Sequence, residues 1–285
     1  MQALPDDELA AVRGSDGIAF NLSNFSLTSI PSNPLSLTYF APGGGSLTLG
    51  RLDLSRTDDA DVFADPYFLT MRLRPGLPDV IALDFPLNPV DTGNQKWTLT
   101  ADFSHCSLFA DGACTGTVFD GGTLQVEGLA MRGGGLYLSS PAIPNTDGIA
   151  FGFGTRLDID TLGVYPHGRA PDDTIDRSES LTFGGIHLAD ATTGGAWMLA
   201  DVTSHPGLFN AQTEIDPVTG NPVSYLHLQI GWPTSVDAVP AASFKVDTIA
   251  FMSYGTATMS FGTSAAPAVS IASMQINYID IKLKP

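Results

Sequence analysis

The chain has 285 residues, of which 43% are hydrophobic and 15% are charged. Its 30 acidic residues outnumber its 13 basic ones, which gives a formal net charge of −17 at pH 7. A field of that sign repels nucleic acid and anionic lipid, so nucleic acid is not an expected partner. The 30 glycines and 20 prolines favour short strands and many turns, and the length allows two lobes or one large β domain.

Residues 1–15 are expected to form a short N-terminal helix. The segment from Leu4 to Gly14 has acidic residues in its first turn, Arg13 in its last turn and a glycine as a stop signal. No run of about 18 apolar residues occurs, so no transmembrane helix is expected. No basic region followed by an apolar one is visible at the start, so we expect either a cytosolic protein or one whose leader has been removed.

The phrase Asp-Gly-Ile-Ala-Phe occurs twice, at residues 16–20 and 147–151. Two further matches follow in the same order: residues 46–54 with 180–188, and the apolar positions of 124–138 with those of 269–283. Ordered matches of this length favour an internal duplication, with one β-rich repeat over residues 16–146 and a second over residues 147–285. Chance similarity between glycine-rich β sequences is the alternative.

Apolar and polar residues alternate over most of the chain after residue 16, which is typical of strands. The expected strands include residues 18–22, 67–73, 80–87, 97–103 and 274–284. Few stretches beyond the first 14 residues have a helical period. The expected fold class is therefore all-β, with two similar halves that each resemble a β-sandwich or jelly roll.

The two cysteines, Cys106 and Cys114, flank a short segment that contains the turn sequence Ala-Asp-Gly. We expect a disulfide across this hairpin, and a disulfide favours an oxidising compartment. Two separate thiols, or a metal pair helped by His105, are the alternatives. A zinc site usually needs four ligands, and the sequence has no second cysteine cluster.

Residues 4–18, Leu-Pro-Asp-Asp-Glu-Leu-Ala-Ala-Val-Arg-Gly-Ser-Asp-Gly-Ile, resemble the segment after the signal peptide in FilA-like pilus-system proteins, which are secreted, glycine-rich proteins of Gram-negative bacteria. The core of this segment is also similar to the leader of double-glycine secreted peptides, although Ser15 stands where the second glycine would be. The resemblance implies an extracellular protein at the bacterial cell surface. It carries over no catalytic residues.

The search for catalytic motifs finds no nucleophile elbow, zinc-protease motif, phosphate-binding loop or Rossmann fingerprint. The five histidines are scattered singly, and none is expected to be catalytic: His105, His167, His187, His205 and His227. Asp158 and Asp160 lie two apart on an expected strand and hence on one face, a spacing that suits an acid and base pair or a cation. Because glycosidase carboxylates usually face each other from different strands, we do not expect these two to be a glycosidase pair. With no catalytic motif found, we expect no enzyme activity.

Four aspartates crowd one acidic loop: Asp58, Asp59, Asp61 and Asp65. The loop lacks the central glycine of an EF-hand, so the metal hypothesis is an irregular calcium site. A solvated acidic loop is the alternative. No other cofactor is expected.

The sequence favours a secreted structural protein of the bacterial surface, either a filament subunit or an adhesin without catalytic activity. A carbohydrate-binding or carbohydrate-active jelly roll and an outer-membrane β-barrel are the alternatives. We expect self-association by strand addition, or contacts with other surface proteins, at edges formed by the two end segments of the chain. The residues expected there are Ile18, Phe20, Ile276, Tyr278, Ile281 and Leu283.

Overall fold

The computed structural model describes residues 17–20, 22, 25–30, 34–40, 44–57, 66–88, 95–110, 112–142, 146–170, 172–217, 220–231, 240–253 and 257–283. These residues contain strands and no helix, and nearly all the strands join antiparallel sheets, so the all-β prediction is confirmed. The expected N-terminal helix, residues 1–15, lies outside the described residues. No described segment is a helix long and apolar enough to cross a membrane.

The strands follow one another in chain order. They are β1 (Ile18–Phe20), β2 (Ser26–Leu27), β3 (Leu37–Phe40), β4 (Ser46–Arg56), β5 (Tyr67–Arg72), β6 (Val80–Asp84), β7 (Trp97–Cys106), β8 (Phe109–Ala110), β9 (Ala113–Cys114), β10 (Val118–Ser139), β11 (Ile149–Tyr165), β12 (Ser180–Asp190), β13 (Trp197–Ala200), β14 (Gly207–Ile215), β15 (Pro222–Gly231), β16 (Ala242–Ser253), β17 (Ala257–Phe261), β18 (Val269–Met274) and β19 (Tyr278–Leu283).

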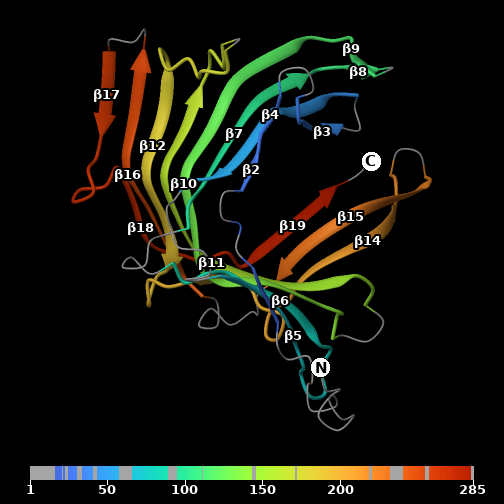
Figure 1. Ribbon diagram of the computed structural model, residues 1–285. Coiled ribbons are helices and arrows are strands. Elements are labelled where there is room, and N and C mark those ends of the chain that lie inside the picture. The colour runs from blue at the N-terminus through green and yellow to red at the C-terminus, as the bar shows by residue number, and fades with distance from the viewer. Residues whose placement is uncertain are drawn as a thin grey trace, which may run out of the picture.

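Two long strands, β10 and β11, pair with each other and run through two sheets (Figure 1). The first half of β10 and the second half of β11 belong to a sheet with the order β3–β4–β7–β10–β11–β12–β16–β18. Their other halves belong to a sheet with the order β1–β5–β6–β10–β11–β14–β15–β19. Further pairings join β2 to β4, β17 to β16 and β13 to β11.

Glycines allow β10 to bend from one sheet into the other. The register of β10 against β11 shifts between Arg132 and Gly135, and Gly133 and Gly134 have positive φ values of 61° and 71°. A Cβ atom at Gly134 would also collide with the carbonyl oxygen of Gly154 on β11. Both the backbone angle and the lack of space therefore favour glycine at this bend.

The strand pairings of the first half recur in the second half with the same register. Ile18 of β1 pairs with Leu69 of β5, and Ile149 of β11 pairs with Phe209 of β14. Other equivalent pairs are Leu54↔Leu99 with Leu188↔Phe244, Leu99↔Val126 with Phe244↔Ile271, and Leu83↔Leu136 with Leu228↔Ile281. The three sequence matches therefore coincide with strands that occupy equivalent positions.

Each long strand corresponds to three short strands of the other half. The strand β11 corresponds to β1, β2 and β3. Its pairing with β14 corresponds to that of β1 with β5, and its pairing with β12 corresponds to that of β2 and β3 with β4. The strand β10 corresponds to β17, β18 and β19. Its pairing with β7 corresponds to that of β17 and β18 with β16, and its pairing with β6 corresponds to that of β19 with β15. The division into two domains, residues 16–146 and 147–285, stays a prediction. The pairing of β10 with β11 joins the two halves in both sheets.

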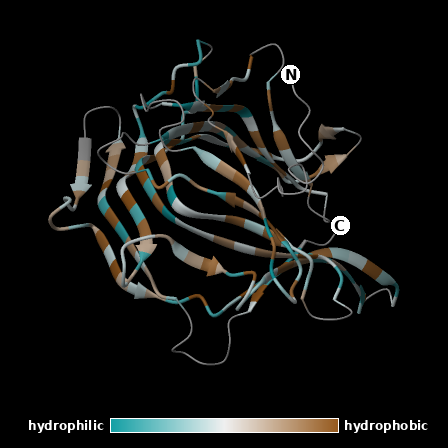
Figure 2. Cartoon of the chain, turned by 60° about the horizontal axis from the view of Figure 1, so that its bottom comes forward, coloured by the Kyte–Doolittle hydropathy of each residue, from teal (hydrophilic) through white to brown (hydrophobic). Residues whose placement is uncertain are grey.

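A row of aromatic rings from both halves of the chain lies between the two sheets. Phe20, Tyr67, Phe85 and Phe153 follow one another with ring centroids 5.6 to 6.2 Å apart. Trp97, which comes from the other sheet, donates its indole N–H to the Tyr67 hydroxyl at 3.3 Å. These contacts place the core between the sheets. Figure 2 shows hydrophobic and hydrophilic residues alternating along the strands, and such alternation gives a sheet one more apolar face.

Large aliphatic side chains are seldom enclosed in the described part of the chain. The largest side chains with less than 2% exposure there are Tyr165, Asn88, Thr123 and Pro86. Many leucines, isoleucines and phenylalanines are exposed instead, and several of them lie on the outermost strands. The sheets therefore present apolar surface outward, and exposed apolar surface commonly marks an interaction site.

Candidate functional site: the outer sheet edges

Asp158 and Asp160 both lie on β11, but they bind different partners. Asp158 is 7% exposed, and three basic side chains surround its carboxylate: Arg132 Nε at 2.6 Å, Arg156 Nε at 3.0 Å and His187 Nδ1 at 2.6 Å. The Asp160 side chain is 58% exposed and pairs with Lys96 Nζ at 2.6 Å. Each carboxylate therefore has its own cation, so the spacing of two has not produced a shared site.

The surroundings of Asp158 favour its charged form. Burial opposes ionisation, but hydrogen bonds from His187 and Arg156 and the charge of Arg132 outweigh it and lower the pKa of Asp158. A general acid needs a raised pKa to hold its proton near neutral pH. The arrangement is therefore suited to joining β10, β11 and β12 through charge.

A second charged cluster ties the loop after β11 to the first half of the chain. Arg169 has a side chain that is 3% exposed, and it binds Asp53 on β4 and Asp102 on β7, with its Nε 2.9 Å from Asp102. It also donates to the carbonyl oxygen of Arg51, and Arg51 in turn pairs with Asp102 and Asp173. Although burial opposes it, hydrogen bonding to Asp102 and Asp53 raises the pKa of Arg169.

Beside this cluster lies a hollow of 570 Å³ with several polar side chains in its lining. Its lining includes Thr48, Ser104, Asp120 and His167, with the ring of Phe103 among them. Hydroxyl, carboxylate and imidazole groups around an aromatic ring can bind a polar ligand such as a sugar. The residues come from both halves of the chain.

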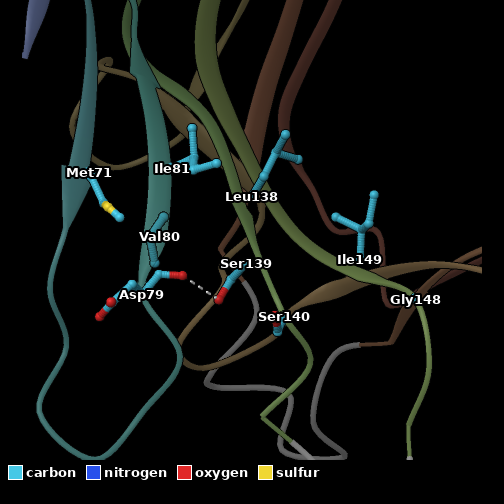
Figure 3. Close-up of a pocket in the computed structure, with 9 residues that line it drawn as sticks. All are labelled: Met71, Asp79, Val80, Ile81, Leu138, Ser139, Ser140, Gly148 and Ile149. Carbon is cyan, nitrogen blue, oxygen red and sulfur yellow. Dashed lines mark hydrogen bonds between the residues drawn. The ribbon is translucent and has the colours of Figure 1, made fainter.

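A second hollow, of 400 Å³, lies where β5 and β6 approach the joint between β10 and β11 (Figure 3). Its walls are mainly aliphatic, from Met71, Ile81, Leu138 and Ile149 among others. The hydroxyl of Ser139 donates to the carbonyl oxygen of Asp79 at 2.9 Å and is therefore already satisfied. The lining of this hollow therefore suits an apolar group better than a catalytic reaction.

Cys106 and Cys114 lie at disulfide distance, as the sequence predicts. Their Sγ atoms are 1.97 Å apart and their Cα atoms 5.9 Å apart, and the bond joins the end of β7 to the β8–β9 hairpin. The described residues contain no group of three or more His, Cys, Asp or Glu side chains that could hold a metal ion. The calcium candidates lie outside the described residues, and that hypothesis stays a prediction: Asp58, Asp59, Asp61 and Asp65.

The short strands near the two chain ends form the outer edges of both sheets. We define the N-edge as β1, β2 and β3, and the C-edge as β17, β18 and β19. Within the residues that the structure describes, each of these strands pairs on one side only. Figure 1 shows β3 and β17 at opposite ends of the first sheet. Each sheet therefore has strands of the N-edge at one end and strands of the C-edge at the other.

The N-edge strands are apolar and contain no charged residue. Their exposed large side chains are Ile18 at 65%, Leu27 at 45%, Leu37 at 65%, Tyr39 at 50% and Phe40 at 55%. Phe20 differs from these, because it is half-buried and stacks on Tyr67. Natural edge strands are commonly protected from pairing with other chains by short length, charged residues, proline or bulges. Of these features, the N-edge strands show short length.

The C-edge strands contain two charged residues, Asp280 and Lys282, and both interact with their own sheet. The carboxylate of Asp280 lies 2.8 Å from Nε2 of His227, and Nζ of Lys282 lies 3.7 Å from Glu214 and 5.4 Å from the ring centre of Tyr225. The exposed large side chains of this edge are Met259 at 60%, Phe261 at 49%, Ile271 at 41%, Tyr278 at 57% and Ile281 at 45%.

Five of the six predicted assembly residues lie in these edge strands, and Ile276 lies in the connection between two of them. Ile18 and Phe20 belong to β1, Ile276 lies between β18 and β19, and β19 contains Tyr278, Ile281 and Leu283. Sequence reasoning missed β3 and β17. Prolines and glycines around β3 indicated a loop, although the alternation of Leu35, Leu37 and Tyr39 was a signal for a strand.

No protein-family model, no curated protein and no solved structure matches this chain.

Proposed function

We propose that the chain is a structural protein of the bacterial cell surface that associates with further copies of itself through its N-edge and C-edge. The observation that carries this proposal is the state of these edges: both sheets end in short strands that are almost free of charge and rich in exposed apolar side chains. Edge strands with so little charge can pair with strands of another chain.

Two further features support a place outside the cell. The cysteine pair at disulfide distance suits an oxidising compartment. The resemblance of residues 4–18 to FilA-like pilus-system proteins points to the same place and to a filament or adhesive role. The internal neutralisation of Asp158 and Arg169 fits a scaffold whose charges stabilise the fold.

The proposal is tested by a charge on the N-edge. Leu37→Lys puts a cation on β3, and Ile81→Lys is the control, because Ile81 is also exposed, at 54%, but lies on β6 between the paired strands β5 and β10. Light scattering and negative-stain microscopy should find the wild-type protein and Ile81→Lys in assemblies larger than a monomer, and Leu37→Lys as a monomer. A monomeric wild-type protein at high concentration, or equal behaviour of the two variants, would refute the proposal.

The hollow beside Arg169 supports a second candidate function, carbohydrate binding. Thr48, Ser104, Asp120 and His167 line it together with Phe103, and such a set suits sugar hydroxyls. A glycan array with the wild-type protein and Asp120→Ala tests it. Binding that the substitution removes would favour this function, and an array without signal would exclude it for the glycans present.

A further inference from the structure

The chain already contains one joint between a C-terminal strand of one repeat and an N-terminal strand of the next. This joint is the antiparallel pairing of β10 with β11, and it extends through both sheets. Directly opposite residues in it include Val126 and Leu162 in the first sheet and Leu136 and Phe153 in the second. It shows how these halves fit side by side.

The C-edge is the structural counterpart of β10. Val126 of β10 pairs with Leu99 of β7, and Ile271 of β18 pairs with Phe244 of β16, the residue equivalent to Leu99. In the other sheet, Leu136↔Leu83 corresponds in the same way to Ile281↔Leu228. All these positions differ by the same offset of 145 residues.

The N-edge is the structural counterpart of β11. Leu162 of β11 pairs with Phe183 of β12, and Leu37 of β3 pairs with Leu49 of β4, the residue equivalent to Phe183. Ile149 and Ile18 likewise pair with equivalent residues of β14 and β5. The side of β11 that binds β10 is therefore the side that the N-edge leaves open in the described structure.

Equivalent positions are covered in the joint and open at the edges. Ala150, which lies opposite Ser139 in the joint, is 3% exposed, whereas its counterpart Ala19 is exposed. Val126 is half-buried, whereas its counterpart Ile271 is 41% exposed. Positions that are covered in the pairing of β10 with β11 are therefore exposed at the equivalent places on the two edges.

We propose that the C-edge of one copy pairs antiparallel with the N-edge of a second copy, in the register of the β10–β11 joint. This register places Ile271 opposite Leu37. It also places Ile281 opposite Leu22, which lies two residues after β1 and corresponds to Phe153 by the offset of 131 that relates Ile18 to Ile149. The inference rests on the proposed function, to which it adds the partner surface and the register. Because the two edges differ, every contact leaves one edge of each kind open, and the sheets continue from copy to copy into a filament.

Electrostatics favour this contact over others between copies. The molecule has a net charge of −17, so most of its surface repels a second copy. The strands of both edges together contain only Asp280 and Lys282 as charged residues, and these two have opposite signs and partners within their own sheet. The proposed contact therefore joins the least charged parts of the surface.

Cysteine cross-linking tests the register. Copies with Ile271→Cys are mixed with copies with Leu37→Cys under mild oxidation, and the linked peptides are identified by mass spectrometry. Directly opposite residues in an antiparallel pair have Cα atoms about 4.5 to 5.5 Å apart, which a disulfide can span. Ile281→Cys with Leu22→Cys forms an independent pair in the other sheet, and Ile271→Cys with Ile81→Cys is the control.

The expected result is a cross-linked dimer in the mixture of each matched pair. No such dimer should form with either variant alone or in the control mixture. Assembly without the 37–271 and 22–281 links, or links between two copies of Ile271→Cys, would overturn this register while the proposed function stands. If light scattering finds no assembly, both proposals fall. Circular dichroism of each variant confirms that it is folded.

Discussion

Asp158 offers a sharp test of charge at the scale of single residues. Asp158→Asn leaves Arg132, Arg156 and His187 without their anion, and we expect a loss of about 2 kcal/mol in the free energy of unfolding, less than the roughly 3 to 5 kcal/mol for a fully buried pair because two of the partners are partly exposed. Asp160→Asn, two residues along β11, should cost less than about 1 kcal/mol. Urea unfolding measures both, and equal losses would contradict the assignment.

The lowered pKa of Asp158 also predicts how stability depends on pH. The folded pKa lies below the unfolded value of about 3.9, so the carboxylate contributes fully above that value, and the contribution is lost as the pH falls through the lower folded pKa. We expect the unfolding free energy of the wild-type protein to fall more steeply below about pH 4 than that of Asp158→Asn. Parallel curves for the two proteins would argue against this role.

We expect the hairpin closed by Cys106 and Cys114 to be oxidised but to matter little to the fold. The loop is short, so its closure contributes about 2 to 3 kcal/mol in the loop-entropy model. Backbone hydrogen bonds also hold it, from Ser107 N–H to Thr117 and from Thr115 N–H to Leu108, both at 2.9 Å. Alkylation without reductant followed by intact mass should find no labelled cysteine, and two labels would contradict the prediction.

How far the elements could be predicted depends on how local their signals are. The repeated Ile-Ala-Phe phrase and the alternation of Leu136 and Leu138 indicated strands and their correspondence, because side-chain period is a local property. The bending of β10 at Gly134 and the pairing of β10 with β11 depend on contacts between distant segments, which periodicity does not specify. The same holds for Asp158, whose three partners come from three strands.

At the scale of the whole molecule, the net charge of −17 should oppose association between copies. Salt screens such repulsion, with a Debye length of about 30 Å at 0.01 M and about 10 Å at 0.1 M ionic strength. We therefore expect self-association to strengthen as sodium chloride is raised, since the proposed contact is apolar. Sedimentation velocity across a salt series measures it. Dissociation by salt would indicate that ion pairs hold the copies together.

Blocking one edge at a time tests the head-to-tail contact most directly. Leu37→Lys blocks the N-edge and leaves the C-edge intact, whereas Ile271→Lys blocks the C-edge and leaves the N-edge intact. A mixture then has one usable edge of each kind, so sedimentation equilibrium should find each variant alone at 29.9 kDa and the mixture at twice that mass, with nothing longer. A mixture that stays monomeric, or a variant that dimerises alone, would contradict the account.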